Sequence, residues 1–424
     1  MNISSVKNLI SNNVLNEQFS LLYQDIEVAK DRYLKACDSF LEIFGDRDNI
    51  RIISAPGRTE VGGNHTDHQH GRVLAGSVDL DIIGIVSLNN DNVVRIKSEG
   101  FKMDEIELDN LEINPSETGR AAALIRGMCG NFAKRGLSYG GFDAYTTSNV
   151  MKGSGLSSSA AFEVFVGTVL NFTLNDGNIS PVEIAKMAQN AESVYFGKPC
   201  GLLDQSASAL GGFTAIDFKD PEKPVVENIK FELEKHGHVL CVVDTGGNHA
   251  NLTQDYADIT VECRNISNHF NAGFLRDVNE EEFFENIAVL KEKYGDRAVL
   301  RAIHFFAEDM RAENEKNALK SNDFDTFLKL INESGNSSYK YLQNTYSNSN
   351  VHEQGLCLGL ALTERFLKGR GACRVHGGGF AGTIQCFVPS ELIDDYKNMI
   401  EKVFGQSSCH ILKIRPVGGF EFKL

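Results

Sequence analysis

The stretch Ala55-Pro-Gly-Arg-Thr-Glu-Val-Gly-Gly-Asn-His-Thr-Asp-His-Gln-His-Gly71 follows the short hydrophobic segment Ile50–Ser54 and carries one polar side chain after another. The hydrophobic segment predicts a β-strand. Pro56 and Gly57 are expected to end this strand, because proline cannot donate to a sheet and glycine weakens one. Glycines later in the stretch permit the tight, positive-φ backbone of a loop that wraps a small ligand.

Four side chains of this loop favour sugar binding. Arg58, Asn64, His65 and Asp67 are directional hydrogen-bonding groups. A sugar is a ring of hydroxyl groups, and its recognition needs such groups at fixed angles. We therefore predict that the loop binds a sugar.

Two other interpretations of the loop stay open. Polar, glycine-rich turns are common after strands and need not bind anything. Imidazole and carboxylate groups also suit zinc, and the loop offers four of them: His65, Asp67, His68 and His70. No HExxH helix accompanies these residues, and an irregular loop fixes four ligands poorly.

The composition is that of an ordinary globular protein, with 42% hydrophobic and 23% charged residues among 424. This length allows two or three domains with substantial cores. The net charge of −15 makes a nucleic acid or an anionic membrane surface an unsuitable main partner, so an anionic ligand must be held by local cations.

Cysteine usage and the chain start both indicate a cytoplasmic protein. The nine cysteines are scattered without a CxxC pair, which fits free thiols in a reducing compartment. The first seven residues lack the basic region and apolar run of a secretory signal. The longest apolar region, about residues 73–88, is interrupted by Asp79 and Asp81, so no membrane span is expected.

The pattern of hydrophobic residues predicts a mixture of helices and strands. Helices are expected over residues 14–44, 118–135, 157–174, 180–196 and 355–368. Strands are expected over residues 50–54, 73–88, 93–98, 141–147, 213–218, 239–244, 372–374, 383–388 and 412–417. Long charged helices are expected after the strand at residues 239–244 and up to about residue 350. Strands do not alternate regularly with helices, so the pattern favours an α+β fold over a doubly wound sheet.

A proline-containing segment, Lys219–Pro224, suggests a domain boundary. We place one domain at residues 1–222 and a second at residues 223–424. The sugar loop, the phosphate loop and the catalytic aspartate described below then belong to the first domain.

A second motif, Lys152–Ala161, leads directly into a predicted helix and suits phosphate binding. Glycines bring backbone N–H groups close to a phosphate, and the start of a helix adds a positive dipole end. The motif is neither a Walker A loop nor a complete GxGxxG, and a plain helix-entry turn is the alternative. The residues expected to hold a phosphate group, which the family resemblance given below identifies as part of ATP, are Gly153, Ser154, Gly155, Leu156, Ser157, Ser158 and Ser159.

Two acidic residues and a third glycine cluster complete the candidate site. Glu192 has small neighbours on its helix, and Asp204 lies among small and apolar residues, where a carboxylate must be paired or used as a base. A solvated helix position and a helix cap are the respective alternatives. Gly377–Gly379 brings the backbone close to another group, or simply forms a tight hairpin.

In this order and spacing, the motifs resemble the galactokinase branch of the GHMP small-molecule kinases, from about Arg32 to the C-terminus. The matching segments are Pro56–Asp67, Gly153–Ala160, Pro199–Gln205, the Tyr256 and Cys263 pair, and Gly377–Phe380. The resemblance implies transfer of the ATP γ-phosphoryl group to the C1 hydroxyl of galactose. It also implies an N-terminal mixed-sheet domain of the ribosomal S5 domain 2-like type and a ferredoxin-like C-terminal domain.

The resemblance assigns roles to individual residues. Asp204 falls on the catalytic base, and Arg58 on the arginine that stabilises this base and the transferring group. Ser159 and Glu192 fall on the Mg²⁺ ligands. The sugar contacts fall on His65, Asp67 and Tyr256, together with Asn64 in place of a glutamate. ATP and a small sugar are the expected partners of a chain that we expect to be a monomer.

The sugar loop departs from the usual family sequence at four positions: Glu60 for Asn, Gly62 for Ile, Asn64 for Glu and His68 for Tyr. Asparagine at position 64 turns a charge-assisted bond to the C6 hydroxyl into a neutral one, weaker by roughly 1 kcal/mol. A C1 kinase for N-acetylgalactosamine or a C6-modified galactose is therefore an alternative. A regulator that binds sugar and ATP without catalysis is a second one, disfavoured by the complete serine-rich loop.

Overall fold

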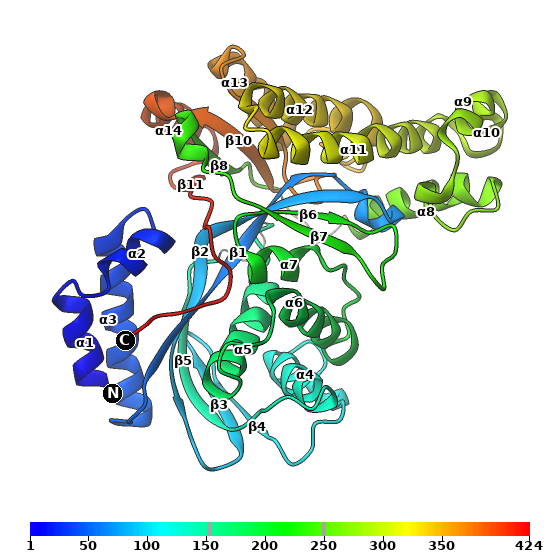
Figure 1. Ribbon diagram of the computed structural model, residues 1–424. Helices are drawn as coiled ribbons and strands as arrows, with labels where there is room; N and C mark the ends of the chain where they lie inside the picture. Colours follow the sequence, from blue (N-terminus) through cyan, green and yellow to red (C-terminus); the bar gives the residue numbers. More distant parts are fainter. Residues whose placement is uncertain (151–154, 248–251) are drawn as a thin grey trace.

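The computed structural model describes residues 1–150, 155–247 and 252–424, which form two β-sheets and the helices around them (Figure 1). The larger sheet has the strand order β12-β1-β2-β5-β3-β4, with β6 on β2 and β7 on β6. Its strands are β1 (Arg51–Gly62), β2 (Arg72–Leu88), β3 (Val93–Ser98), β4 (Met103–Glu107), β5 (Phe142–Ser148), β6 (Phe213–Asp217), β7 (Val225–Ile229) and β12 (Phe420–Glu421).

The long strand β2 connects the two halves of this sheet. Its first residues pair with β6, its last residues pair with β5, and β1 runs antiparallel along both parts. Alternate residues of a strand face opposite sides. Ile52 and Ile85 accordingly pack into one hydrophobic cluster, while Ile53 and Val86 pack into another.

Helices cover both faces of the larger sheet (Figure 1). One face packs against α1 (Ile3–Ser11), α2 (Asn16–Leu22) and α3 (Ile26–Phe44). The other packs against α4 (Ala121–Lys134), α5 (Ser158–Leu174), α6 (Pro181–Asn190) and α7 (Leu203–Leu210). The described residues contain no helix with both the length and the apolar character needed to cross a membrane.

The smaller sheet is antiparallel with the order β11-β8-β10-β9. Its strands are β8 (His238–Asp244), β9 (Ala372–Val375), β10 (Thr383–Pro389) and β11 (Cys409–Leu412), and α13 (Gly355–Leu367) and α14 (Ile393–Phe404) pack on it. Helices connect β8 to β9 and β10 to β11. This β-α-β-β-α-β connectivity is ferredoxin-like, as the resemblance implied.

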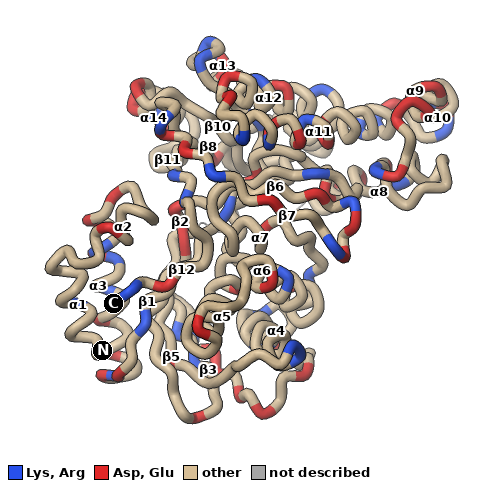
Figure 2. The backbone as a smooth tube through the Cα atoms, in the orientation of Figure 1, with Lys and Arg blue, Asp and Glu red and all other residues tan. Residues whose placement is uncertain are grey.

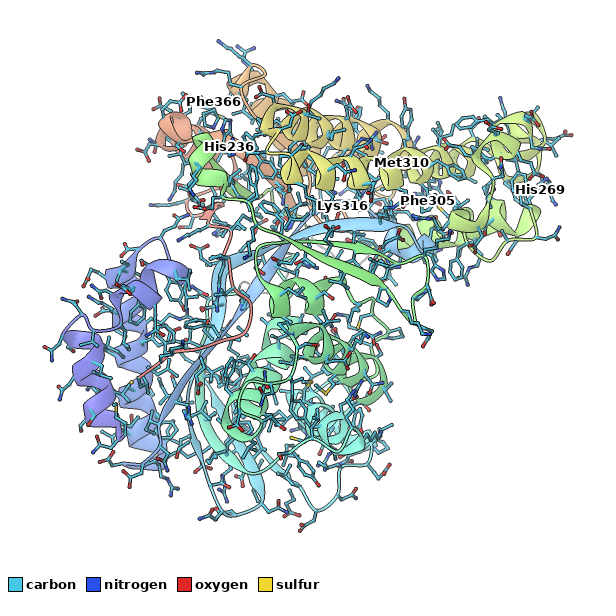
Figure 3. All side chains as sticks on the ribbon, viewed as in Figure 1. His236, His269, Phe305, Met310, Lys316 and Phe366 are labelled. Atoms are coloured by element: carbon cyan, nitrogen blue, oxygen red, sulfur yellow. The ribbon has the colours of Figure 1, made fainter. Side chains whose placement is uncertain are left out.

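A helical layer connects β8 to α13. It consists of α8 (Thr253–His269), α9 (Glu280–Glu285), α10 (Ile287–Tyr294), α11 (Asp296–Lys320) and α12 (Phe324–Ser337). Figure 3 shows Phe305, Met310 and Lys316 along α11, beside the larger sheet. Lys316 pairs with Glu227 of β7 at 3.7 Å. Figure 2 shows acidic residues gathered at α9, at the far end of this layer.

The predicted elements largely match, with four corrections. Strand β1 continues past Pro56 and Gly57 to Gly62, because a register shift between Pro56 and Arg58 accommodates both residues without ending the ladder. The helix predicted over residues 14–44 breaks after Leu22. The strand predicted at 412–417 lies at Cys409–Leu412. Elements α1, β4, α7, β7 and β12 were not predicted.

The hairpin β6–β7 spans the predicted domain boundary. Residues Phe213–Asp217 pair with Val225–Ile229 in the larger sheet, and β12 returns to pair with β1. The division at residue 222 stays a prediction.

Candidate active site

Arg58 and Glu60 project from the same face of β1 because they are two residues apart on a strand. Both line a cavity of about 240 Å³. Its other walls come from the loop after β1, from the start of α7 with the segment before it, and from the backbone of Gly377 and Gly378. The cavity therefore joins segments that are more than 300 residues apart in the chain.

The cavity contains the two predicted catalytic residues as an ion pair. Arg58 Nε donates a hydrogen bond of 2.6 Å to Asp204 Oδ1. Asp204 lies in the first turn of α7, where the helix dipole also favours a carboxylate. Burial raises the pKa of Asp204, but the charge and the hydrogen bond of Arg58, the hydrogen bond of Ser157 and the charge of Lys198 together lower this pKa below its ordinary value. Asp204 is therefore a carboxylate at neutral pH.

The serine-rich loop reaches this pair. Ser157, with a φ of 56°, donates a hydrogen bond to Asp204 Oδ2, and Arg58 Nη1 donates to the carbonyl of Gly155. The carbonyl of Leu156 accepts a hydrogen bond of 3.1 Å from the backbone N–H of Arg58, while the side chain of Leu156 is buried in the core. Helix α5 begins at Ser158. The predicted phosphate contacts at residues 153 and 154 lie outside the described residues.

A second polar group surrounds Glu192. Its Oε1 accepts bonds from Ser159 Oγ at 3.0 Å and from Lys198 Nζ at 2.9 Å, and its Oε2 accepts one from Gln205 Nε2 at 2.7 Å. Gln205 Nε2 also donates to Glu163 Oε2 at 3.1 Å. Glu192 lies in a π-helical turn, Ala191–Phe196, and such turns often occur at functional sites.

Sequence reasoning missed Glu163, although a signal for it existed. Glu163 follows Ser159 by four residues on α5, so both lie on one face of the helix. The side chain is fully buried, and its Oε1 has no hydrogen-bond partner among the described residues. Burial and the neighbouring charge of Glu192 raise the pKa of Glu163 well above its ordinary value.

The donors around Glu192 suit Mg²⁺ and exclude a self-contained metal cage. Mg²⁺ prefers oxygen ligands and is usually held by one or two carboxylates together with substrate phosphates. Ser159 and Glu192 supply such oxygens. No group of three or more His, Cys, Asp or Glu side chains in the described part of the chain could hold a metal without further ligands.

The zinc interpretation of the loop after β1 is therefore wrong for the described residues. The ring of His70 stacks on Phe274, with ring centroids 3.4 Å apart. His65 instead bonds to a backbone carbonyl in the cavity wall, as detailed next. The candidate zinc ligands thus form no metal-binding group among the described residues, although His65, Asp67 and His68 line the same cavity.

His65 and Asp67 face the cavity as the sugar hypothesis requires. His65 has a φ of 62°, and its Nε2 lies 2.9 Å from the carbonyl oxygen of Gly378. Burial lowers the pKa of His65 to about 4. The ring is therefore neutral at pH 7 and donates from Nε2, which leaves Nδ1 as an acceptor.

The glycines of this loop serve close packing more than unusual torsion angles. Of Gly62, Gly63 and Gly71, Gly63 alone has a positive φ, at 81°. A Cβ on Gly62 would lie 1.6 Å from Glu315 Oε2, and one on Gly71 would lie 2.7 Å from the Thr66 Cβ. The prediction of positive φ is thus wrong for two of the three glycines.

Asn64 is buried with every side-chain hydrogen-bonding group directed at protein. Its Nδ2 donates to Glu60 Oε1 at 3.0 Å and to the carbonyl of Gly377 at 2.7 Å. Its Oδ1 accepts from Asn344 Nδ2 at 2.8 Å and from Ser338 Oγ at 3.2 Å. Asn64 does not line the cavity, whereas Glu60 does.

Tyr256 lies behind the glycine loop. Its Oη donates a bond of 2.9 Å to the carbonyl of Gly379, and a Cβ on Gly378 would lie 2.6 Å from its Cε1. Tyr256 is absent from the described cavity wall. The close approach that the glycine cluster predicted is thus an approach to Tyr256 on one side and to the cavity on the other.

Comparison with known proteins shows to which family the chain belongs. The model of the GHMP kinase N-terminal domain matches residues 122–212, and the galactokinase galactose-binding signature matches residues 38–88. A galactokinase from Clostridium acetobutylicum is 30% identical over 389 residues, which cover 89% of this chain and 96% of the relative. The chain belongs to the galactokinase family. Membership of this family makes the protein a sugar kinase of the GHMP superfamily.

Other members of the galactokinase family and related kinases extend the comparison. The galactokinase of Actinobacillus pleuropneumoniae is 30% identical over 352 residues, covering 82% of this chain and 88% of the relative. A galactokinase from Lactococcus lactis, crystallised with galactose, has a TM-score of 0.74 at 23% identity, over 90% of this chain and 98% of that one. A mevalonate kinase from Methanococcus jannaschii has a TM-score of 0.60 at 16% identity, over 87% and 99%. The expected α+β GHMP kinase fold is confirmed.

Proposed function

We propose that the protein transfers the γ-phosphoryl group of ATP to the C1 hydroxyl of galactose, which yields galactose 1-phosphate and ADP. The carrying observation is the Arg58–Asp204 ion pair in the wall of the 240 Å³ cavity, with Ser157 of the phosphate loop bonded to the same aspartate. The galactose-binding signature spans the part of the chain that supplies Arg58, His65 and Asp67, which supports galactose as the sugar.

The chemistry of this step needs positioning and charge stabilisation more than covalent help. Asp204, held as a carboxylate, accepts the proton of the C1 hydroxyl as its oxygen bonds to the γ-phosphorus. The bond between that phosphorus and the β–γ bridging oxygen breaks, and ADP leaves. Arg58 stabilises the negative charge on the transferring group. A carboxylate with a lowered pKa is a weak proton acceptor. Orienting the C1 hydroxyl is therefore a large part of the contribution of Asp204 to catalysis.

The phosphates of ATP are proposed to lie at the start of α5, where the backbone N–H groups of Ser157, Ser158 and Ser159 and the helix dipole favour anions. Gly155 and Leu156 shape this turn, and residues 153 and 154 belong to the proposal on sequence grounds. Ser159 and Glu192 would hold Mg²⁺, which neutralises phosphate charge when bound. Lys198 supplies a further cation beside them.

On the sugar side, His65 and Asp67 are proposed to bond to sugar hydroxyls directly. Asn64 and Tyr256 are proposed to support the cavity wall without contacting the sugar, because their described bonds go to the loop and to the glycine backbone. A cytoplasmic location and a monomeric state stay predictions from the sequence.

An ADP-release assay with a sugar panel tests the proposal. Galactose should turn over faster than N-acetylgalactosamine and C6-modified galactoses. Turnover of an analogue better than galactose would favour the related-sugar alternative, and sugar binding without ADP release would favour the non-catalytic regulator.

The aspartate assignment is tested by Asp204→Asn. This variant should lose roughly 10²- to 10⁴-fold in kcat, because the proton acceptor is gone. Sugar affinity measured by calorimetry should remain within about threefold, a difference below 1 kcal/mol. Unchanged turnover would refute Asp204 as the base.

A further inference from the structure

Glu60 is a carboxylate in the cavity wall to which no role has been given above. It projects beside Arg58 from β1, and 15% of its side chain is exposed. Its Oε1 accepts two hydrogen bonds, from Arg374 Nη2 at 2.8 Å and from Asn64 Nδ2 at 3.0 Å. Its Oε2 accepts none from the described residues.

Arg374 fixes the position of the Glu60 side chain and balances its charge. The Arg374 side chain is fully buried in β9 and also donates to the carbonyls of Val61 and Val375. A buried arginine needs a charged partner, since removing that partner leaves an uncompensated charge. Two donors on one oxygen restrict the rotamers of Glu60, so the second oxygen is pre-organised at the cavity.

The side-chain amide of Asn64 cannot serve as the hydrogen-bond acceptor for the sugar. Each hydrogen-bonding group of the Asn64 side chain already has a protein partner, and Asn64 contributes to fixing Glu60. The carboxylate of this part of the cavity is thus supplied by position 60, although the sequence suggested that its loss at position 64 weakens sugar recognition.

We infer that Glu60 is a specificity-determining residue, whose Oε2 accepts a hydrogen bond from one hydroxyl group of the sugar. This inference rests on the proposed function. The wall also contains the carboxylates Asp67 and Asp204 against one cation, Arg58, among its described residues. The ligand class is therefore a neutral polyhydroxylated monosaccharide, and sugars that carry a carboxylate are disfavoured.

The variant Glu60→Gln tests the role of one atom. Glutamine keeps an oxygen that can accept from Arg374 and Asn64, both of which are donors here, and it directs its NH₂ group to the cavity. The side-chain shape is retained while the charged acceptor becomes a neutral donor. Glu222→Gln is the matched control, because Glu222 is exposed and lines the adjoining 470 Å³ cavity but not this one.

The measurement is kcat/KM, with Kd from calorimetry in parallel, for galactose and for its deoxy and fluoro analogues at each hydroxyl other than C1. In the unmodified protein and the Glu222→Gln control, loss of the partner hydroxyl should lower both affinity and kcat/KM roughly 12- to 150-fold, as expected for a charge-assisted bond. The fluoro analogue should lose as much, since fluorine cannot donate. In Glu60→Gln the same loss should shrink to roughly 2- to 12-fold.

Three outcomes separate the hypotheses. Equal analogue penalties in the unmodified protein and in Glu60→Gln would overturn the inference while leaving the kinase function intact. Galactose that binds without being phosphorylated would refute the proposed function, and the Kd values would still decide on Glu60. If Glu60→Gln failed to fold, the fluoro analogues would still test the inference in the unmodified protein. It would be overturned if every fluoro analogue, whatever the position of the fluorine, bound as tightly as galactose.

Discussion

Replacing Arg58 with glutamine should change the pH dependence of catalysis through Asp204. In the protein as it is, burial raises the pKa of Asp204, while Arg58, with smaller contributions from Ser157 and Lys198, lowers this pKa below its ordinary value. Glutamine retains a polar side chain but removes the charge. The pKa of Asp204 should then rise, and protonation of the base should appear as a fall of kcat/KM on the acid side.

The structure bounds the size of this change. An adjacent opposite charge lowers a carboxyl pKa by about 1 to 3 units. The contact is short, at 2.6 Å, but 33% of the Asp204 side chain is exposed and solvent screens the pair. We therefore expect a shift near the lower end, about one pH unit or ~1.4 kcal/mol. The plateau of kcat should also fall roughly 10- to 150-fold, through loss of a charge-assisted bond.

The assay is ADP release at limiting galactose between about pH 3 and pH 9, where the acid limb reports the free enzyme. Arg51→Gln is the control, since Arg51 lies on the same strand and pairs with Glu421 at 2.9 Å, away from the cavity. Its profile should keep the unmodified shape. A profile of Arg58→Gln with an unmoved or lower acid limb would refute the assignment of Arg58 as the group that sets the charge of Asp204.

Three further outcomes are expected. Glu192→Gln should raise the Mg²⁺ concentration for half-maximal activity roughly tenfold or more, since it removes a charged oxygen ligand; an unchanged Mg²⁺ titration would contradict this. Glu315→Met should stabilise the protein by about 1–3 kcal/mol, because both carboxyl oxygens of Glu315 are buried without a partner among the described residues. Burial raises the pKa of Glu315 well above its ordinary value, so the carboxyl group destabilises the folded protein more as the pH rises above the pKa of Glu315 in the unfolded chain. The increase in urea midpoint caused by Glu315→Met should therefore be larger at about pH 8 than at about pH 5. A larger increase at about pH 5 would contradict this explanation. Burial raises the pKa of the Cys200 thiol to about 12, so iodoacetamide at about pH 8 should label it slowly, and rapid labelling with inactivation would contradict this.

The sequence by itself predicted the proposed reactive parts of the site. Arg58, Asp204, the serine-rich loop and Glu192 lie in short motifs whose order along the chain resembles that of the galactokinases, and this resemblance assigned their roles where local chemistry left alternatives open. Hydrophobic periodicity likewise predicted β2 and α5 closely. These features are local, so neighbouring residues suffice to specify them.

Only the tertiary structure decided how the sugar loop works. Whether Glu60 or Asn64 faces the cavity depends on residues roughly 280 to 315 positions away in the chain. Arg374 bonds to Oε1 of Glu60 and leaves Oε2 free, whereas Asn344 bonds to Oδ1 of Asn64 and the carbonyl of Gly377 accepts from its Nδ2. Gly62 likewise has its reason in Glu315, a distant helix residue. A side chain's direction follows from which partners reach it after folding, and a linear order of residues does not contain those distances.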